Sequence, residues 1–231
     1  MTKMLDILEE FVKEVEKDNP YGLVIKGGTA LSLFYLNHHR ESEDLDFDAD
    51  ISYSREYKKI ETYFIHILEK LRQRDIIKNF SKGKSGLVAT SRYHMKLQLE
   101  TYKAFYTKID VDFVRISSKL KNKGKLFFYS PERLFVTKML TFIDRREFKD
   151  FYDIAHLISH VDINAFKHNQ NVIKLIDDVI TAVLNEDIVR LFKSAFRNVD
   201  LRFKDLNESG VNQFNSKTLK SLRILKNKIN N

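Results

Sequence analysis

Residues 26–31 read Lys-Gly-Gly-Thr-Ala-Leu, and residues 40–47 read Arg-Glu-Ser-Glu-Asp-Leu-Asp-Phe. The first segment ends a short apolar run of strand type (21–26) and opens a helical pattern at 29–36. A strand that enters a helix through two glycines leaves backbone N–H groups exposed at the helix N-terminus, where a phosphate can approach closely. Glycines at such a corner also serve as turn geometry alone, so the pair by itself is weak evidence of a phosphate site.

The second segment predicts a strand with one acidic face. Its alternate residues are Asp44, Asp46, Asp48 and Asp50. Because side chains alternate along a strand, the carboxylates of Asp44 and Asp46 lie close together on one face. Like charges at that distance repel, and a divalent cation between them relieves the repulsion. An exposed acidic edge strand is the alternative, but aspartate is a poor strand former, so the pattern favours a metal site.

A third carboxylate is expected on another strand. Two-metal phosphoryl transfer requires an additional acid to bind the second metal ion and to activate the attacking hydroxyl. The predicted strand around 108–114 has Asp110 and Asp112 on one face and apolar residues on the other. If this strand lies beside the Asp44–Asp46 strand, one of its aspartates completes the trio. The spacing leaves open whether Asp110 or Asp112 does so.

The remaining pattern predicts an α+β protein in two parts. Residues 1–125 combine amphipathic helices at 3–17 and 54–73 with strands at 87–92, 95–102 and 108–116. Residues 126–231 are helical almost throughout, with apolar stripes at 131–144, 149–160, 170–184, 186–196 and 219–229. Proline at position 131 marks the start of the first of these helices. We therefore expect a mixed sheet with flanking helices, followed by a helical bundle, with the boundary near 117–130.

Composition restricts the choice of partner and compartment. The 231 residues have a net charge of +8, which favours polyanionic partners, although lysines in runs such as 119–125 are equally explained as solvated surface. The absence of cysteine excludes disulfides and thiolate zinc sites. No apolar run reaches the roughly 20 residues of a membrane span, and the first ten residues do not form a signal peptide. We expect a cytoplasmic protein with no membrane partner.

These motifs carry a resemblance to a known family. Gly27-Gly28-Thr29 with the downstream Asp44-Leu45-Asp46 resembles the signature of the DNA polymerase β-like nucleotidyltransferase superfamily. More narrowly, 26–31 and 40–47 look like the AbiEii/AbiGii family of nucleotidyltransferase toxins, to which the MenT toxins are similar in their core. The family also has a helix with a lysine followed by an Arg-x-x-x-Arg-Asp-x-x-Asp pattern, matched here by Lys138 and by residues 145–153.

The resemblance implies a mechanism and a set of site residues. It predicts a polymerase β-like fold that transfers a nucleotide from an NTP with release of pyrophosphate, using two Mg²⁺ ions or Mn²⁺ in their place. The metal ligands would be Asp44, Asp46 and Asp110. Lys138 would contact the triphosphate and would also count among the catalytic groups. The nucleotide would lie in a cleft between the two parts. The full set of nucleotide-binding residues would be Gly27, Gly28, Thr29, Arg40, Ser42, Lys138 and Asp150. For Arg40, an ion pair with Glu41 or Glu43 is an equal alternative.

The family also implies partners. RNA, specifically the 3′ end of tRNA, is the expected acceptor, and a cognate antitoxin is expected to be encoded alongside. Transfer to a small molecule or a protein, and a non-catalytic nucleotide- or nucleic-acid-binding role, are the alternatives. Three departures from the family pattern stand out: a long interval between Thr29 and Asp44, lysine instead of arginine at Lys149, and threonine instead of the superfamily's serine at Thr29. None removes a metal ligand, so an active enzyme is expected.

Overall fold

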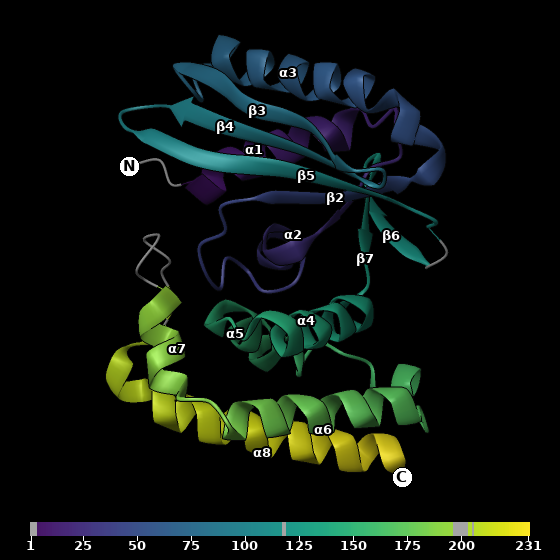
Figure 1. The fold of residues 1–231 in the computed structure, drawn as a ribbon, viewed down its shortest axis with the longest axis vertical. Helices are drawn as coiled ribbons and strands as arrows, with labels where there is room; N and C mark the ends of the chain where they lie inside the picture. The colour runs from purple at the N-terminus through teal and green to yellow at the C-terminus, as the bar shows by residue number, and fades with distance from the viewer. Residues whose placement is uncertain (1–3, 117–118, 196–202, 205) are drawn as a thin grey trace. The chain divides into compact units, whose positions relative to one another are not determined.

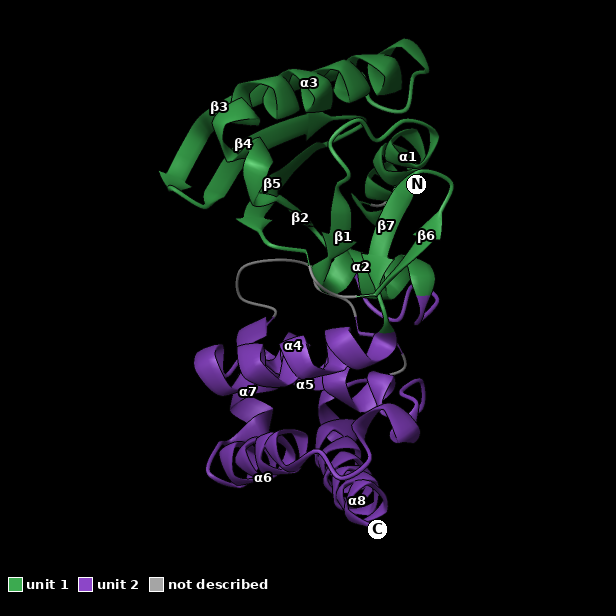
Figure 2. Cartoon of the chain, turned by 90° about the vertical axis from the view of Figure 1, so that its right-hand side faces the viewer, with its two compact units in different colours: residues 1–34, 42–130 green, residues 35–41, 131–231 purple. Residues whose placement is uncertain are grey.

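The computed structural model describes residues 4–116, 119–195, 203–204 and 206–231. The chain forms two compact units (Figure 2). Unit 1 comprises Met1–Phe34 and Ser42–Ser130, and unit 2 comprises Tyr35–Glu41 and Pro131–Asn231. The boundary region predicted at 117–130 includes residues 117 and 118, which lie outside the described residues. The segment 35–41, although it is inserted in the sequence of unit 1, belongs to unit 2.

Unit 1 is built on a mixed seven-stranded sheet in the order β3-β4-β5-β2-β1-β7-β6 (Figure 1). Its strands are β1 (Val24–Lys26), β2 (Leu45–Asp50), β3 (Asn79–Ala89), β4 (Arg92–Glu100), β5 (Ala104–Val114), β6 (Leu120–Lys123) and β7 (Leu126–Tyr129). The pairs β2–β5 and β1–β7 are parallel, and the other neighbours are antiparallel. The central position of β2 between β1 and β5 places the acidic segment in the middle of the sheet.

Helices cover the apolar face of the sheet. Unit 1 contains α1 (Met4–Lys17), α2 (Gly27–Phe34), α3 (Tyr57–Gln73) and the short 3₁₀ helix η1 (Ile51–Glu56). Phe64 of α3 contacts both Phe11 of α1 and Phe47 of β2, with ring centroids 5.7 and 5.8 Å apart. All three phenylalanines are fully buried, so burial of their rings joins two helices to the sheet.

Unit 2 is helical. Its elements are α4 (Pro131–Arg145), α5 (Phe148–Leu157), η2 (Ile163–Phe166), α6 (Gln170–Leu184), α7 (Ile188–Ala195), η3 (Glu208–Gly210) and α8 (Val211–Asn230). Helices α6 and α8 lie side by side in the bundle (Figure 1). Phe148 of α5 is buried and contacts the rings of Phe192 and Phe203 at 5.1 and 5.2 Å. In the described parts of both units, no helix is long and apolar enough to cross a membrane.

The predicted α+β fold is confirmed, with differences in the outer strands. The expected strand 87–92 was wrong, because residues 90 and 91 form the turn of the β3–β4 hairpin. Strand β3 instead begins at Asn79 and includes a polar, glycine-containing stretch that is typical of a loop. The lysine run at 119–125 contributes the edge strand β6, where Lys123 pairs with Glu16 at 3.1 Å. The terminal helix α8 begins at Val211, eight residues before the predicted start.

Candidate active site

Gly27 forms the corner between β1 and α2. Its φ of +73° lies in the left-handed region, which glycine adopts at little cost. A Cβ at this position would lie 2.4 Å from Oδ2 of Asp46. Glycine is therefore required here both for the turn and for the close approach of the Asp46 carboxylate, and Gly28 follows it directly in the first turn of α2.

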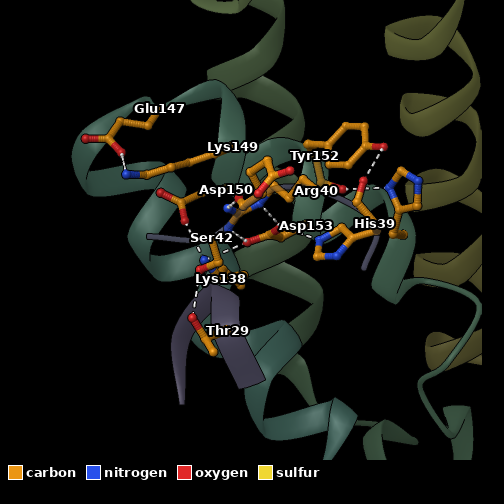
Figure 3. Close-up of polar contacts among 12 residues, drawn as sticks. Thr29, His39, Arg40, Ser42, Lys138, Glu147, Lys149, Asp150, Tyr152 and Asp153 are labelled. Atoms are coloured by element: carbon orange, nitrogen blue, oxygen red, sulfur yellow. Dashed lines mark hydrogen bonds and ion pairs between the residues drawn. The ribbon is translucent and has the colours of Figure 1, made fainter. Parts of the chain in front are cut away.

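Thr29 and Ser42 hold the segment that leads into β2. The Thr29 hydroxyl donates to the main-chain carbonyl of Asp44 at 2.6 Å, and it is hydrogen-bonded to the Ser42 hydroxyl at 2.8 Å (Figure 3). Both side chains are buried. These contacts fix the backbone at Asp44, and the predicted contact of Thr29 with phosphate stays a prediction.

The parallel pairing of β2 and β5 brings the predicted carboxylates together. Asp46 is directly opposite Asp110 in the register. Burial, together with the charges of Asp44 and Asp110, raises the pKa of Asp46 above its ordinary value, against the lowering effect of Lys108. The raised pKa of Asp46 reflects the concentration of negative charge at this point of the sheet, which the alternation of aspartates along the two strands predicted.

Two basic side chains flank the three carboxylates. Nζ of Lys108 lies 3.5 Å from Oδ2 of Asp44 and 3.3 Å from Oδ2 of Asp110. His94 is the cross-strand partner of Asp110 on β4, and its Nδ1 lies 2.5 Å from Oδ1 of Asp110. Lys108 thus supplies positive charge between Asp44 and Asp110, and His94 fixes the orientation of the Asp110 carboxylate.

Asp112 has a different environment. Arg92 donates to both of its carboxylate oxygens, at 2.5 and 2.9 Å, and Lys26 donates to Oδ2 at 2.6 Å. Burial alone would raise the pKa of Asp112, but the hydrogen bonds from Arg92 and Lys26 outweigh burial and lower it. Asp48, opposite Asp112 in the register, is likewise engaged by Lys26 and by the Tyr129 hydroxyl. Asp112 therefore has its charge balanced by protein cations.

The donor set of Asp44, Asp46 and Asp110 suits a hard divalent cation, which prefers carboxylate oxygens. The raised pKa of Asp46 and the Lys108 ammonium group near Asp44 and Asp110 both indicate a position that favours positive charge. Among the described residues, no three acidic or histidine side chains converge closely enough to form a ready-made metal site. Metal binding there stays a prediction.

Unit 2 contains a second charged cluster, centred on Asp153 of α5. Arg40 donates to its two carboxylate oxygens through Nε and Nη2, both at 2.7 Å (Figure 3). Lys138 of α4 lies 2.7 Å from Asp153 and 2.8 Å from Asp150, and His39 Nε2 lies 2.7 Å from Asp153. Asp150 and Asp153 are fully buried, so each charge depends on its partners.

The balance of charge in this cluster is seen in the pKa values. Burial alone would raise the pKa of Asp153, but Arg40 and Lys138 outweigh it and hold the pKa well below its ordinary value. Burial lowers the pKa of Lys138, but Asp153 and Asp150 more than compensate, so the net shift is upward. The cluster therefore keeps Asp153 ionised and Lys138 protonated inside the unit.

The structure places Arg40 and Lys138 in contacts that the sequence did not predict. Arg40 forms its ion pair with Asp153, and Lys138 is only 7% exposed. Their predicted contact with a triphosphate stays a prediction. Sequence reasoning also missed a set of partners, namely Lys26, Arg92, His94, Lys108 and Asp153. Asp153 is the last residue of the matched pattern at 145–153, which was the one signal that could have identified it.

Comparison with known proteins identifies the family and the fold of the chain. A family model described as "Nucleotidyl transferase AbiEii toxin, Type IV TA system" matches residues 7–209. No curated protein matches the chain. Two solved structures from Helicobacter pylori, that of JHP933 and that of a putative nucleotidyltransferase, each have a TM-score of 0.68 at 18% identity. They cover 99% and 98% of this chain and 94% of their own.

A third solved structure is MenT4, the nucleotidyltransferase toxin Rv2826c from Mycobacterium tuberculosis H37Rv. It has a TM-score of 0.50 at 16% identity over 96% of this chain and 82% of that one. At these identities the solved structures show the fold, and the family is shown by the match over 7–209. The protein is therefore a nucleotidyltransferase that belongs to the AbiEii toxin family of type IV toxin–antitoxin systems.

Proposed function

We propose that this nucleotidyltransferase uses Mg²⁺, or Mn²⁺ in its place, to transfer a nucleoside monophosphate from an NTP to the 3′ end of an RNA, with tRNA as the acceptor. Family membership implies a nucleotide substrate and an antitoxin counterpart. We further propose that the antitoxin is encoded beside the toxin and that both act in the cytoplasm.

The observation that supports the reaction best is the register of β2 and β5, which sets Asp46 opposite Asp110. Divalent ions held by Asp44, Asp46 and Asp110 would stabilise the negative charge that develops on the attacking and leaving oxygens. Asp110 would accept the proton of the acceptor hydroxyl, whose oxygen bonds to the α-phosphorus as pyrophosphate leaves. Gly27 and Gly28, at the start of α2, would face the triphosphate through their backbone N–H groups.

The structure also supports a choice between the two aspartates of β5. Asp112 accepts hydrogen bonds from two cations, Arg92 and Lys26. Asp110 instead shares the cation Lys108 with Asp44 and lies opposite the carboxylate of Asp46. We therefore assign the third carboxylate to Asp110. For Arg40, Lys138 and Asp150 we propose the nucleotide-binding role that the family resemblance implies; within unit 2, Asp153 pairs with Arg40 and Lys138, and Asp150 pairs with Lys138.

The test is incubation with total tRNA, Mg²⁺ and each α-labelled NTP in turn, followed by a denaturing gel. Wild type should label the RNA, and Asp46→Ala should not. Asp110→Asn should lower transfer at least about a hundredfold, as expected for loss of a group that acts on the transition state. Asp112→Asn, the matched control on the same strand, should stay within about tenfold of wild type.

Each result has a defined meaning. Equal loss in Asp110→Asn and Asp112→Asn would contradict the assignment of the third carboxylate. Full activity of Asp46→Ala would overturn the site. Absence of label on RNA with every NTP would exclude tRNA as the acceptor, and label on the protein itself or on an added small molecule would identify the alternative acceptor class.

A further inference from the structure

The hairpin β3–β4 and strand β5 have one covered and one open face. Alternate residues of β4, namely Tyr93, Met95, Leu97 and Leu99, are buried on the side of α3. The residues between them point to the opposite face, which no helix of unit 1 covers in this part of the sheet (Figure 1). This open face is continuous with the carboxylates, because Asp110 lies on it.

Four residues beside Asp110 define what we call the open-face platform: Lys96 and Gln98 on β4, and Tyr106 and Lys108 on β5. Antiparallel pairing sets Lys96 opposite Lys108 and Gln98 opposite Tyr106. Tyr106 is four residues before Asp110 on the same strand, which is a distance of about 13 Å. The platform therefore extends directly from the candidate catalytic carboxylates.

The aromatic member of the platform is unusually open to solvent. Tyr106 is 73% exposed, the highest value among the large hydrophobic residues that the structure describes. A tyrosine on a sheet face presents a flat ring on which a nucleic-acid base can stack, and stacking of this kind is tolerant of base identity.

The cations of the platform complement a phosphate backbone. Lys96 is exposed and forms no ion pair with any described residue, while Lys108 sits beside the carboxylates. The adjacent strand β3 contributes little bulk here. Gly86 pairs with His94, and a Cβ on Gly83 would already lie 3.4 Å from Cβ of Lys96. At these two positions β3 therefore places no side chain beside the platform.

Resting on the proposed function, we propose that the open-face platform binds the single-stranded end of the RNA acceptor. Tyr106 stacks on a base with Gln98 opposite it, and Lys96 pairs with a backbone phosphate; Lys108, opposite Lys96, lies between Tyr106 and Asp110. An exposed ring combined with unpaired positive charge is the combination that single-stranded nucleic acid requires. A protein partner would require a larger apolar surface than one exposed tyrosine.

The first measurement is the fluorescence anisotropy of a labelled single-stranded RNA, titrated with the full-length protein in the presence of Mg²⁺ and without NTP. Tyr106→Ala should raise the Kd about tenfold or more, and Tyr106→Phe should restore wild-type affinity because the ring is kept. A blunt RNA duplex of the same sequence should bind more weakly than the single strand, because its bases cannot stack on the ring.

The dependence of RNA binding on salt concentration separates the contribution of base stacking on Tyr106 from that of the phosphate contact of Lys96. Lys96→Gln should reduce the slope of log Kd against log salt concentration by about 0.7, the value for one phosphate contact to a single strand. Tyr106→Ala should leave this slope unchanged. Lys58→Gln is the matched control, because Lys58 is an exposed lysine of α3, the helix that covers the opposite face of the sheet. It should change neither the Kd nor the slope.

Transfer of label to RNA by the same variants distinguishes this inference from the proposed function. Tyr106→Ala should raise KM for RNA and leave kcat within about threefold, as expected when uniform binding is lost.

The combined results separate the two proposals. If wild type transfers label to RNA, but Tyr106→Ala and Lys96→Gln bind RNA as tightly as wild type, the platform is refuted while the reaction stands. If the variants lose binding but wild type transfers no nucleotide, the reaction is refuted while the platform stands. If wild type does not bind RNA, both are refuted.

Discussion

At the scale of single residues, Gly27 connects backbone conformation to the candidate chemistry. We expect Gly27→Ala to lower nucleotide transfer at least about a hundredfold, because its Cβ would displace the Asp46 carboxylate from its present position. Because alanine is strained at this positive φ, the substitution should also lower the free energy of unfolding by about 1–2 kcal/mol. Steady-state transfer assays and urea unfolding measure the two effects.

Gly22→Ala is the matched control for this substitution. Gly22 also has a positive φ, +58°, but a Cβ there would meet nothing within 4 Å. The variant should therefore lose a similar amount of stability and keep its transfer activity. Equal loss of activity in the two variants would show that backbone strain, and not displacement of Asp46, causes the effect.

Asp153 gives a prediction about stability and its dependence on pH. Asp153→Asn should lower the free energy of unfolding by about 3–5 kcal/mol, because Arg40 and Lys138 would keep buried charges with one fewer counterion. In wild type, the lowered pKa means that Asp153 stabilises the fold fully above the unfolded-state pKa near 3.8, and that this stability is lost as pH falls below it.

Unfolding in urea at pH 7 and at successively lower pH values tests this prediction. Wild type should lose stability steeply below about pH 4, and the Asp153→Asn variant should show a shallower loss because it lacks the titrating group. Asp177→Asn is a suitable control, because Asp177 is half-exposed and pairs with Lys226 at the surface. It should change stability by about 1 kcal/mol or less.

At the scale of elements, Lys26 links three neighbouring strands. From β1 it forms ion pairs with Asp48 of β2 and Asp112 of β5. We expect Lys26→Met to lower the free energy of unfolding by about 1–3 kcal/mol, because two partly buried carboxylates would then face each other with less compensation. Lys17→Met, which removes a largely exposed partner of Glu14, should have little effect, and urea unfolding of both variants measures the difference.

The elements show how far the sequence determines the fold. Helices α4 and α6 agree with their predicted ranges, because an amphipathic stripe and a proline at the first helical position are local signals. Strand β3 was missed over most of its length. It lies at the edge of the sheet with most of its side chains exposed, so its stability comes from pairing with β4 and not from a local apolar pattern.

The residues of the candidate site also fall into two groups, those that a local sequence pattern predicts and those that it does not. The aspartates of β2 and β5 were predictable, because period-2 alternation is visible within each strand. The residues that surround them were not, because their contacts depend on the register between strands. Lys26 meets Asp112 from 86 residues away, and Arg40 meets Asp153 from 113 residues away. The proposal that Asp110, and not Asp112, is the third metal ligand therefore depends on knowing which cations pair with each aspartate in the folded sheet.

At the scale of the whole molecule, the order of the chain differs from the order of the units. The segment 35–41 belongs to unit 2, although α2 precedes it and the Ser42–Asp44 segment follows it in unit 1. Arg40 and His39 of this segment are held by Asp153. A division of the chain by sequence position alone would separate these ion-pair partners, which belong to the same unit.

The last prediction concerns the response of the whole protein to divalent ions. Burial and the neighbouring carboxylates raise the pKa of Asp46, so its contribution to stability falls as pH rises above the unfolded-state value of 3.8. A bound divalent cation would relieve this cost. At a hundredfold excess over its Kd, a ligand of the native state adds about 2.7 kcal/mol, which corresponds to a rise in Tm of roughly 5–10 °C for a chain of this size.

Thermal unfolding at pH 7.5 with Mg²⁺ and with a chelator provides the measurement. Wild type should melt at a higher temperature with Mg²⁺. Asp46→Asn should be at least as stable as wild type in the chelator, because one repelling charge is removed, and it should gain little from Mg²⁺. Asp50→Asn is the control, since Asp50 lies at the end of β2 and caps the following turn, a role that asparagine also fills. Its Tm should rise with Mg²⁺ as in wild type, and an equal rise in Asp46→Asn would place the metal away from the proposed carboxylates.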